Sequence, residues 1–306
     1  MKVGEFGSVV MAAFTLFTAD LAFAGGAEDH LGATTLGGGG AFRGAAPGAT
    51  AIELNPGVMA IDRRYVVEIT GGDRLGQSEG GGRLMVVDGA TRPNLAVGIL
   101  LGTGWKPGVE VEAPWEVVDA SVEEPLAGVR EATLGFAVPL IKDQLGLGAT
   151  AKYRAYPQEG LETSRAFTTD VGLFYRPVVK VGLGVVGNNL RQTADPELPR
   201  TLGVGVGVKV LPIWLLVGDG TFEWTDNGVV PELRAGSQIV IEEKVPLQVG
   251  VITRLPGDAA EWRLTAGLGL ASDKVARMYA VESTTTGEFA SERERLYQLL
   301  SLSFAL

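Results

Sequence analysis

Residues 145–156 have the sequence Leu-Gly-Leu-Gly-Ala-Thr-Ala-Lys-Tyr-Arg-Ala-Tyr, in which two kinds of position alternate. The odd positions carry Leu, Ala and Tyr, whereas the even positions up to Arg154 carry Gly, Thr, Lys and Arg. Successive side chains of a β-strand point to opposite faces of its sheet. This period of two therefore predicts a strand with one apolar face and one face of glycine and polar residues.

The same alternation occurs at 179–185, 202–210 and 262–270. A soluble sandwich also alternates, but its solvent face is usually rich in Lys, Glu and Thr, whereas glycine is unusually common here. Glycine packs no side chain and often marks the close approach of another backbone. We therefore expect the apolar faces to meet lipid and the glycine faces to line a narrow or plugged barrel.

Fourteen segments have the length and composition of strands. Many are close to the 9–11 residues that cross a bilayer obliquely. Weak alternation in the second and thirteenth leaves counts of twelve and sixteen open. The candidate strands are 63–71, 82–90, 93–104, 129–140, 145–156, 165–176, 178–190, 200–210, 213–225, 231–242, 245–255, 261–272, 274–284 and 294–306.

The connections between these segments alternate in length. Those at 141–144, 211–212 and 243–244 are short, whereas 105–128 is the longest of a longer and more polar set. Short periplasmic turns and longer external loops are typical of outer-membrane barrels. Trp214 and Trp224, ten residues apart on one face of 213–225, are expected to mark the two edges of the apolar band. The sequence thus predicts an all-β, transmembrane antiparallel barrel.

The N-terminal residues predict export and a separate inner segment. Lys2, an apolar run at 9–17 and Ala22-Phe23-Ala24 are typical of a cleaved signal peptide. We therefore divide the chain into a signal peptide at 1–24, a Gly/Ala-rich segment at 25–62 and a barrel at 63–306. Localisation in the bacterial outer membrane follows from export combined with amphipathic strands.

Composition excludes several classes of function. The 306 residues include 44 Gly, no Cys and one His (His30), so thiol chemistry and histidine-based metal sites are not expected. The net charge of −10 argues against a nucleic-acid partner. The run from Gly182 to Gly187 has the G-x-G-x-x-G spacing but lies inside an alternating strand, which disfavours a nucleotide site. We predict a protein that is not an enzyme and has no cofactor and no catalytic or metal-binding residues.

Residues 40–60 resemble the start of the FadL/TodX superfamily of outer-membrane transporters, which includes PorV-like relatives. The resemblance lies in Ala49-Thr50-Ala51-Ile52, Asn55-Pro56 and Met59-Ala60, and departs from the family pattern at Pro47-Gly48 and Gly57-Val58. It implies a fourteen-stranded barrel, here with 25–62 folded inward as a plug. It also implies passage of hydrophobic molecules such as long-chain fatty acids. The alternative that it leaves open is a non-transporting, PorV-like scaffold for secretion or assembly.

Two sets of candidate site residues follow. The plug motif comprises Arg43, Asn55, Pro56 and Gly57, in which Asn and Pro favour a firm turn. Trp105, Pro114 and Trp115 are candidates for hydrophobic contacts in the longest external loop. Asp170, Asp219, Glu223, Glu232 and Glu242 fall on polar strand faces and are expected to form ion pairs in the lumen. The expected partners are outer-membrane lipid, a small hydrophobic ligand and, for a scaffold, another protein.

Overall fold

The computed structural model describes residues 32–74, 80–106, 127–158, 161–191, 198–225, 228–255, 261–272, 274–285 and 295–305. These residues form fourteen strands, as the sequence predicts. The strands are β1 (Tyr65–Arg74), β2 (Gly80–Arg92), β3 (Leu95–Lys106), β4 (Ala127–Ile141), β5 (Leu145–Gln158), β6 (Leu161–Val178), β7 (Val181–Asn188), β8 (Thr201–Leu211), β9 (Trp214–Thr225), β10 (Gly228–Ile241), β11 (Val245–Arg254), β12 (Glu261–Ala271), β13 (Val275–Thr285) and β14 (Arg295–Ala305).

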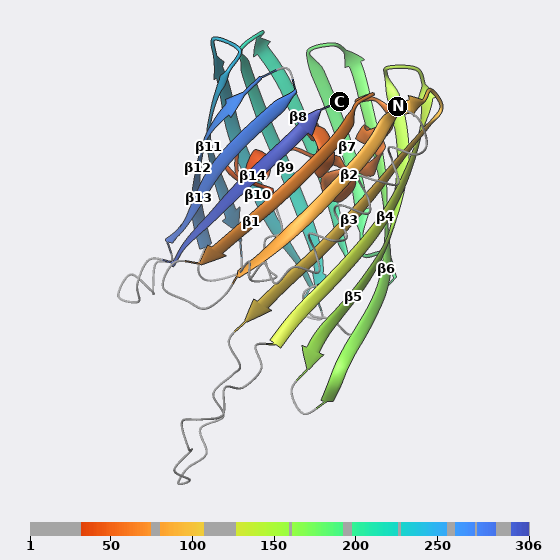
Figure 1. The fold of residues 1–306 in the computed structure, drawn as a ribbon, viewed down its shortest axis with the longest axis vertical. Helices are drawn as coiled ribbons and strands as arrows, with labels where there is room; N and C mark the ends of the chain where they lie inside the picture. Colours follow the sequence, from red (N-terminus) through yellow and green to blue (C-terminus); the bar gives the residue numbers. More distant parts are fainter. Residues whose placement is uncertain are drawn as a thin grey trace.

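The strands form one closed antiparallel barrel (Figure 1). Each strand pairs with its neighbours in sequence, and β1 pairs with β14 to close the wall, with Val66 opposite Ala305. The expected strand ends mostly agree with these bounds to within a few residues. β7 is shorter than the expected 178–190, because Val178 still belongs to β6, residues 179–180 form the turn, and Asn189 adopts a left-handed φ of 51° directly after the strand.

The register separates the two kinds of residue in the way that the alternation predicts. On β5, Leu147 is exposed and lies between Val138 of β4 and Leu173 of β6, which are exposed as well. One position further along, Gly148 and Gly172 face the interior. The outside of the barrel is consequently a continuous aliphatic surface, which is the arrangement of a membrane-spanning barrel.

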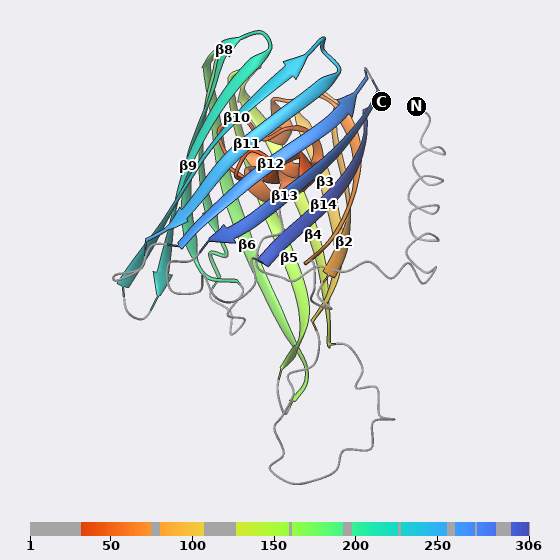
Figure 2. The same cartoon turned by 90° about the vertical axis from the view of Figure 1, so that its left-hand side faces the viewer.

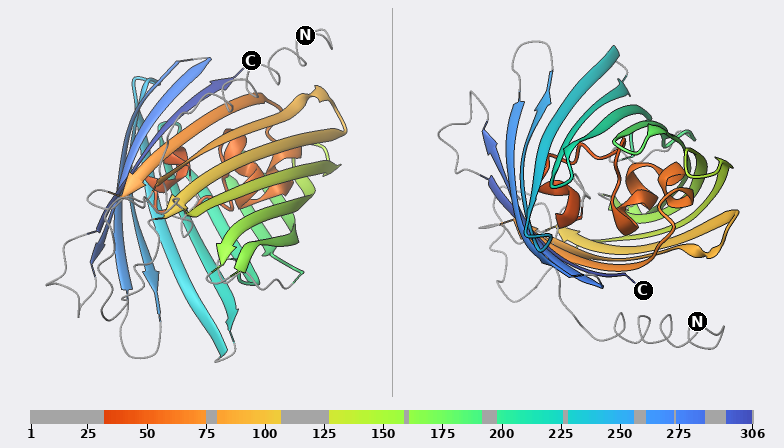
Figure 3. Two further views of the ribbon diagram at one scale, coloured as in Figure 1. Left: turned by 60° about the horizontal axis from the view of Figure 1, so that its bottom comes forward. Right: turned by 90° about the horizontal axis from the view of Figure 1, so that it is seen from above.

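Among the described residues, four short helices precede β1 and lie inside the barrel, as Figure 2 and the end-on view of Figure 3 show. They are α2 (Ala33–Leu36), η1 (Gly48–Thr50), α3 (Ala51–Leu54) and η2 (Pro56–Ala60). No helix among the described residues is long and apolar enough to span a bilayer. The predicted signal peptide at 1–24 lies outside the described residues.

The connections at the two ends of the barrel differ. At the end that is uppermost in Figure 1, turns such as 142–144 and 242–244 link consecutive strands directly. The other end includes the longest connections, such as 107–126, although β5 and β6, and likewise β9 and β10, are only two residues apart there. By the rule that short turns are periplasmic, we expect the lower end in Figure 1 to be the external one.

Trp214 and Trp224 both lie on the outward face of β9. Their register places Asp219 and Glu223 on the inward face, because these residues have the opposite parity. The Trp214 indole Nε1 donates a hydrogen bond to Ser237 Oγ at 2.9 Å, and Trp224 is 49% exposed near the external end of the strand. The expected position of the two rings on the lipid side is therefore correct.

Candidate functional site

The candidate site is the contact between residues 32–62, here called the plug, and the inner wall. Its turn is made by Asn55 and Pro56, between α3 and η2. The Asn55 backbone is extended and ends α3, and its side-chain Oδ1 accepts a hydrogen bond from the Gly57 amide at 3.1 Å. Pro56 is the first residue of η2, where its missing N–H costs nothing. The local sequence thus builds a rigid corner in the chain.

Asn55 also fastens this corner to the wall. Its Nδ2 donates to the carbonyl of Arg43 at 3.1 Å and to the carbonyl of Leu173 in β6 at 3.1 Å. The Asn55 side chain is fully buried, so its amide has no access to water and its polar atoms need partners within the protein. The side-chain amide of Asn55 therefore connects two parts of the plug with each other and with the barrel wall. The sequence predicts the turn but contains no signal for the contact with Leu173.

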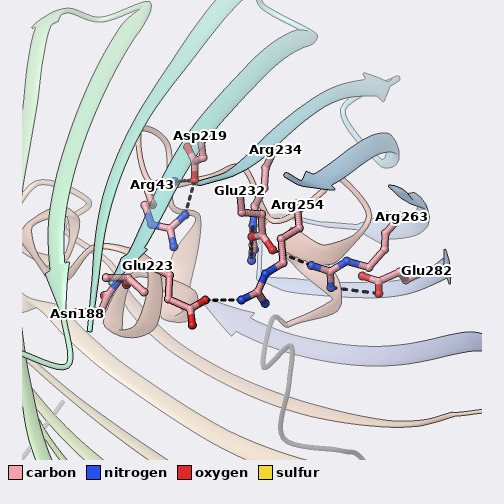
Figure 4. Close-up of polar contacts among 10 residues, drawn as sticks. Arg43, Asn188, Asp219, Glu223, Glu232, Arg234, Arg254, Arg263 and Glu282 are labelled. Carbon is pink, nitrogen blue, oxygen red and sulfur yellow. Dashed lines mark hydrogen bonds and ion pairs between the residues drawn. The ribbon is translucent and has the colours of Figure 1, made fainter. Parts of the chain in front are cut away.

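Arg43 makes the second connection, to Asp219 in β9 (Figure 4). Its Nη1 lies 3.2 Å from Asp219 Oδ2, and its backbone amide donates to the same oxygen at 3.0 Å. Burial lowers the pKa of Arg43, and the neighbouring charge of Asp219 opposes this shift. Removing one member of such a pair leaves a buried charge without its partner. The pair therefore holds the plug to β9.

Between these connections the plug backbone touches the wall backbone directly. A Cβ atom added to Gly57 would lie 2.7 Å from the carbonyl oxygen of Gly146 and 2.9 Å from that of Gly172. A Cβ atom on Gly44 would lie 2.6 Å from Cα of Val206. Real Cβ atoms do not approach this closely. Glycine on both sides is what allows the contact, which explains the glycine faces of β5–β8.

A second set of contacts holds the start of the plug to β10–β12. Gln248 Nε2 donates to the Thr34 carbonyl at 3.0 Å. Thr265 Oγ1 donates to the Gly37 carbonyl at 3.1 Å and accepts from the Gly39 amide at 3.0 Å. Gly39 has a φ of 71°, which other residues rarely adopt. The glycine run at 37–40 therefore serves both the turn and the close approach to the wall.

Glu53 of α3 forms a third connection. Its carboxylate pairs with Arg83 of β2, which also lies 3.5 Å from Glu131 of β4. Burial raises the pKa of Glu53 to about 7, although the positive charge of Arg83 acts in the opposite direction. The carboxyl group of Glu53 therefore gains or loses its proton near neutral pH.

A chain of ion pairs lines the inner wall on β9–β13, as Figure 4 shows. Glu232 lies 2.6 Å from Arg234 and 2.9 Å from Arg263, and Arg263 lies 3.5 Å from Glu282. Arg254 and Glu223 pair at 2.7 Å. This confirms the expected lumenal ion pairs at Asp219, Glu223 and Glu232, and Asp170 likewise pairs with Lys152 at 2.7 Å. The expectation is wrong for Glu242, which is exposed in the turn between β10 and β11, because its φ of 49° ends the strand. Within the described ranges, no three acidic or histidine side chains are placed to hold a metal ion.

Several solved structures share this architecture. A Pseudomonas aeruginosa FadL homologue matches with a TM-score of 0.61 at 12% identity, covering 93% of this chain and 99% of the other. The Pseudomonas putida toluene transporter TodX matches with a TM-score of 0.62 at 10% identity, covering 91% and 97%. The fold is that of the FadL and TodX barrels. No family model and no curated protein matches the sequence.

The remaining predicted site residues are placed as follows in this FadL-type barrel. The backbone of Trp105 belongs to β3, opposite Gly80 of β2. Its side chain, together with Pro114 and Trp115, lies outside the described residues. Arg43, Asn55, Pro56 and Gly57 come together inside the wall, as set out above. Arg83, Glu131 and Gln248 complete the site, although no motif marks them in the sequence.

Proposed function

We propose that this protein is a passive transporter of small hydrophobic molecules in the bacterial outer membrane, and that the plug gates it. The proposal is supported by the fold, which it shares with a FadL homologue and with the toluene transporter TodX. It assigns no catalytic step to the protein. Passage requires displacement of the plug or of side chains at its surface, since the plug occupies the interior.

The observation that carries the proposal is an apolar seam between the plug and the wall. Met59 of η2, Met85 of β2 and Met278 of β13 are all buried in one cluster with Phe42 and Leu100. They are the only methionines after the predicted signal peptide. Methionine is unbranched and adapts its shape at low cost, so such a seam can yield to an apolar molecule and close behind it.

Locking the plug tests this proposal, and the geometry provides the lock. A Cβ atom on Gly135 of β4 would lie 3.1 Å from Cγ1 of Ile52. A sulfur in the place of that Cγ1 would lie at about the 3 Å that separates a sulfur from the partner Cβ across a disulfide. The chain has no cysteine, so the Ile52→Cys/Gly135→Cys variant contains one possible bridge.

Uptake of labelled toluene and of a labelled long-chain fatty acid would be measured in cells lacking other uptake routes. We expect the wild type to take up at least one probe. The oxidised double variant should lose this uptake and regain it with reductant, whereas each single variant should transport under both conditions. Uptake that persists through the oxidised bridge contradicts gating by the plug. Failure of the wild type with both probes, with stoichiometric recovery of a partner protein, would instead support the scaffold.

A further inference from the structure

Exposed arginines gather on the outside of the barrel at the external end of β4–β8. Arg130 belongs to β4, Arg165 to β6, Arg191 follows β7 and Arg200 precedes β8. All four are exposed, and we call them the arginine band. By register, Arg130 and Arg165 are the only charged residues on the outward faces of these five strands within their described bounds. The rest of that surface is mainly aliphatic and aromatic.

The arginine band follows a row of outward aromatic residues. Arg130 and Arg165 both lie opposite Ala155 and are thus two strand spacings apart, about 10 Å. The adjacent row toward the membrane centre contains Tyr153 opposite Phe167, which are 42% and 47% exposed. Each arginine therefore lies one row beyond the aromatic residues.

Arg191 and Arg200 have similar aromatic neighbours. The Arg191 guanidinium lies over the Phe167 ring, 6.0 Å from its centroid. The Arg200 carbonyl accepts a hydrogen bond at 3.1 Å from the amide of Trp224, whose ring is exposed. Aromatic residues with this exposure mark the level where hydrocarbon gives way to headgroups.

The depth of the arginine band agrees with this assignment. Tyr175, an exposed aromatic residue at the turn end of β6, is ten residues from Arg165 on the same outward face. Ten residues at about 3.3 Å each and a tilt near 40° span about 25 Å, the height of the apolar band in such barrels. The guanidinium groups consequently lie at the headgroup level of the external leaflet.

The described part of the chain supplies no counter-charge to the arginine band. No carboxylate in these ranges lies within ion-pair distance of the four arginines, although the whole chain carries a net charge of −10. The inner wall differs, because its arginines pair with glutamates. Guanidinium groups bind phosphate through paired, charge-assisted hydrogen bonds. The missing counter-charge is thus of the kind that a lipid phosphate supplies.

We propose that the arginine band is a binding site for the phosphate groups of an anionic lipid in the external leaflet, with the aromatic row contacting its upper acyl carbons. The site lies on the outside of the wall and is separate from the plug. It rests on the membrane placement proposed above and not on transport.

Binding of diphosphorylated lipid A to the purified barrel, measured by native mass spectrometry in mild detergent, tests this site. The Arg130→Gln/Arg165→Gln/Arg191→Gln variant should bind at least tenfold more weakly than the wild type. The matched control removes three cations at the opposite end of the barrel, Arg92→Gln/Lys180→Gln/Arg277→Gln, and should bind as the wild type does. Replacing the three band arginines with lysine should retain part of the affinity for lipid A. This result would show that the loss of binding in the glutamine variant is due to lost charge and not to misfolding.

Two further binding measurements identify which part of the lipid the arginine band recognises. Lipid A stripped of its phosphates should bind the wild type and the band variant equally. Inorganic phosphate at millimolar concentration should not displace the intact lipid, because it lacks the acyl chains that contact the aromatic row. Equal affinity of the wild type and the band variant for diphosphorylated lipid A would overturn the proposal. Toluene uptake does not enter this test, so the two proposals can fail separately.

Discussion

At the scale of single residues, Asn55 has three roles that the sequence motif only partly indicates. Its place before Pro56 predicts a turn, because Asn bonds to nearby backbone and Pro fixes φ. The contact of its Nδ2 with Leu173 joins residues 118 positions apart. No local pattern encodes such a distance. The same is true of Arg43 and Asp219, whose residue types suit an ion pair but whose pairing depends on the fold.

Replacing Asn55 with alanine should release the plug. The Asn55→Ala variant leaves the buried carbonyls of Arg43 and Leu173 without this donor, which should destabilise the docked plug by about 2–3 kcal/mol. Hydrogen exchange of the plug amides, followed by mass spectrometry, should be faster than in the wild type. The control is Asn188→Ala, because the hydrogen bond that Asn188 donates to Thr201 joins two strands of the wall. Equal exchange in both variants would contradict this role for Asn55.

Glu53 should make docking of the plug depend on pH. Its pKa is raised to about 7 by burial in the docked plug and should return toward 4.5 when the plug is released. The docked state therefore binds the proton more tightly. The contribution of Glu53 to the stability of the docked plug is complete below pH 4.5 and is lost as the pH rises to about 7. Plug amides should consequently exchange faster at pH 8 than at pH 5.5, beyond the intrinsic change in rate.

The pH effect has a direct control in Glu53→Gln. This variant carries no charge at either pH, so its plug stability should be the same at pH 5.5 and pH 8. Arg83, Glu131, Lys152 and Glu68 also act on this carboxyl group and remain in the variant. If the variant keeps the full pH dependence, one of these neighbours, and not Glu53, is responsible.

At the scale of elements, the wall strands were largely predictable and the plug helices were not. Alternation in β5, β8 and β12 is a local property, and it indicates which face meets lipid. The weakly alternating β2 and β13 still form strands because their neighbours on both sides supply the hydrogen bonds. The plug helices contain three to five residues each, too few for a periodic pattern. Their positions depend on contacts with the wall.

Inward glycines that touch the plug backbone should be intolerant of any side chain. A Cβ atom on Gly184 of β7 would overlap the carbonyl oxygen of Arg43, which is backbone and cannot rotate away. Gly184→Ala should therefore displace the plug and speed up exchange of its amides, while the barrel remains closed. Gly220→Ala on β9 is the matched control, because the nearest atoms to its Cβ are 3.7 Å away. Similar plug protection in both variants would show that the contact is dispensable.

At the scale of the whole molecule, the barrel wall does not depend on the plug for its hydrogen bonds. Each strand pairs with two neighbours, and the last pair joins β1 to β14. The even count and the short turns predict this closure from the sequence. The interior arrangement, with Met59, Met85 and Met278 in one cluster, could not be predicted, because these residues come from distant parts of the chain.

Removal of residues 32–61 should leave a folded but open barrel. The wall keeps its ladder, and the charged residues on β9–β13 other than Asp219 keep their ion pairs, so the variant should still migrate faster before heating than after it in a gel. Its interior loses the plug, and planar bilayers should show a larger and steadier conductance than the wild type gives. Loss of the heat-dependent shift would mean that the plug is required for closure of the wall.

The plug lies directly before β1 in the chain, and this position bears on how the barrel closes during assembly. The seam between β1 and β14 joins residues more than 200 positions apart, so it is the slowest contact to form. The plug touches both sides of this seam, since the Ala33 amide donates to Ser301 of β14 and Thr34 donates to Glu68 of β1. Because the inner segment precedes β1 in the chain, it is present while the sheet is still open, and it can serve as the template on which the two edges of the sheet meet.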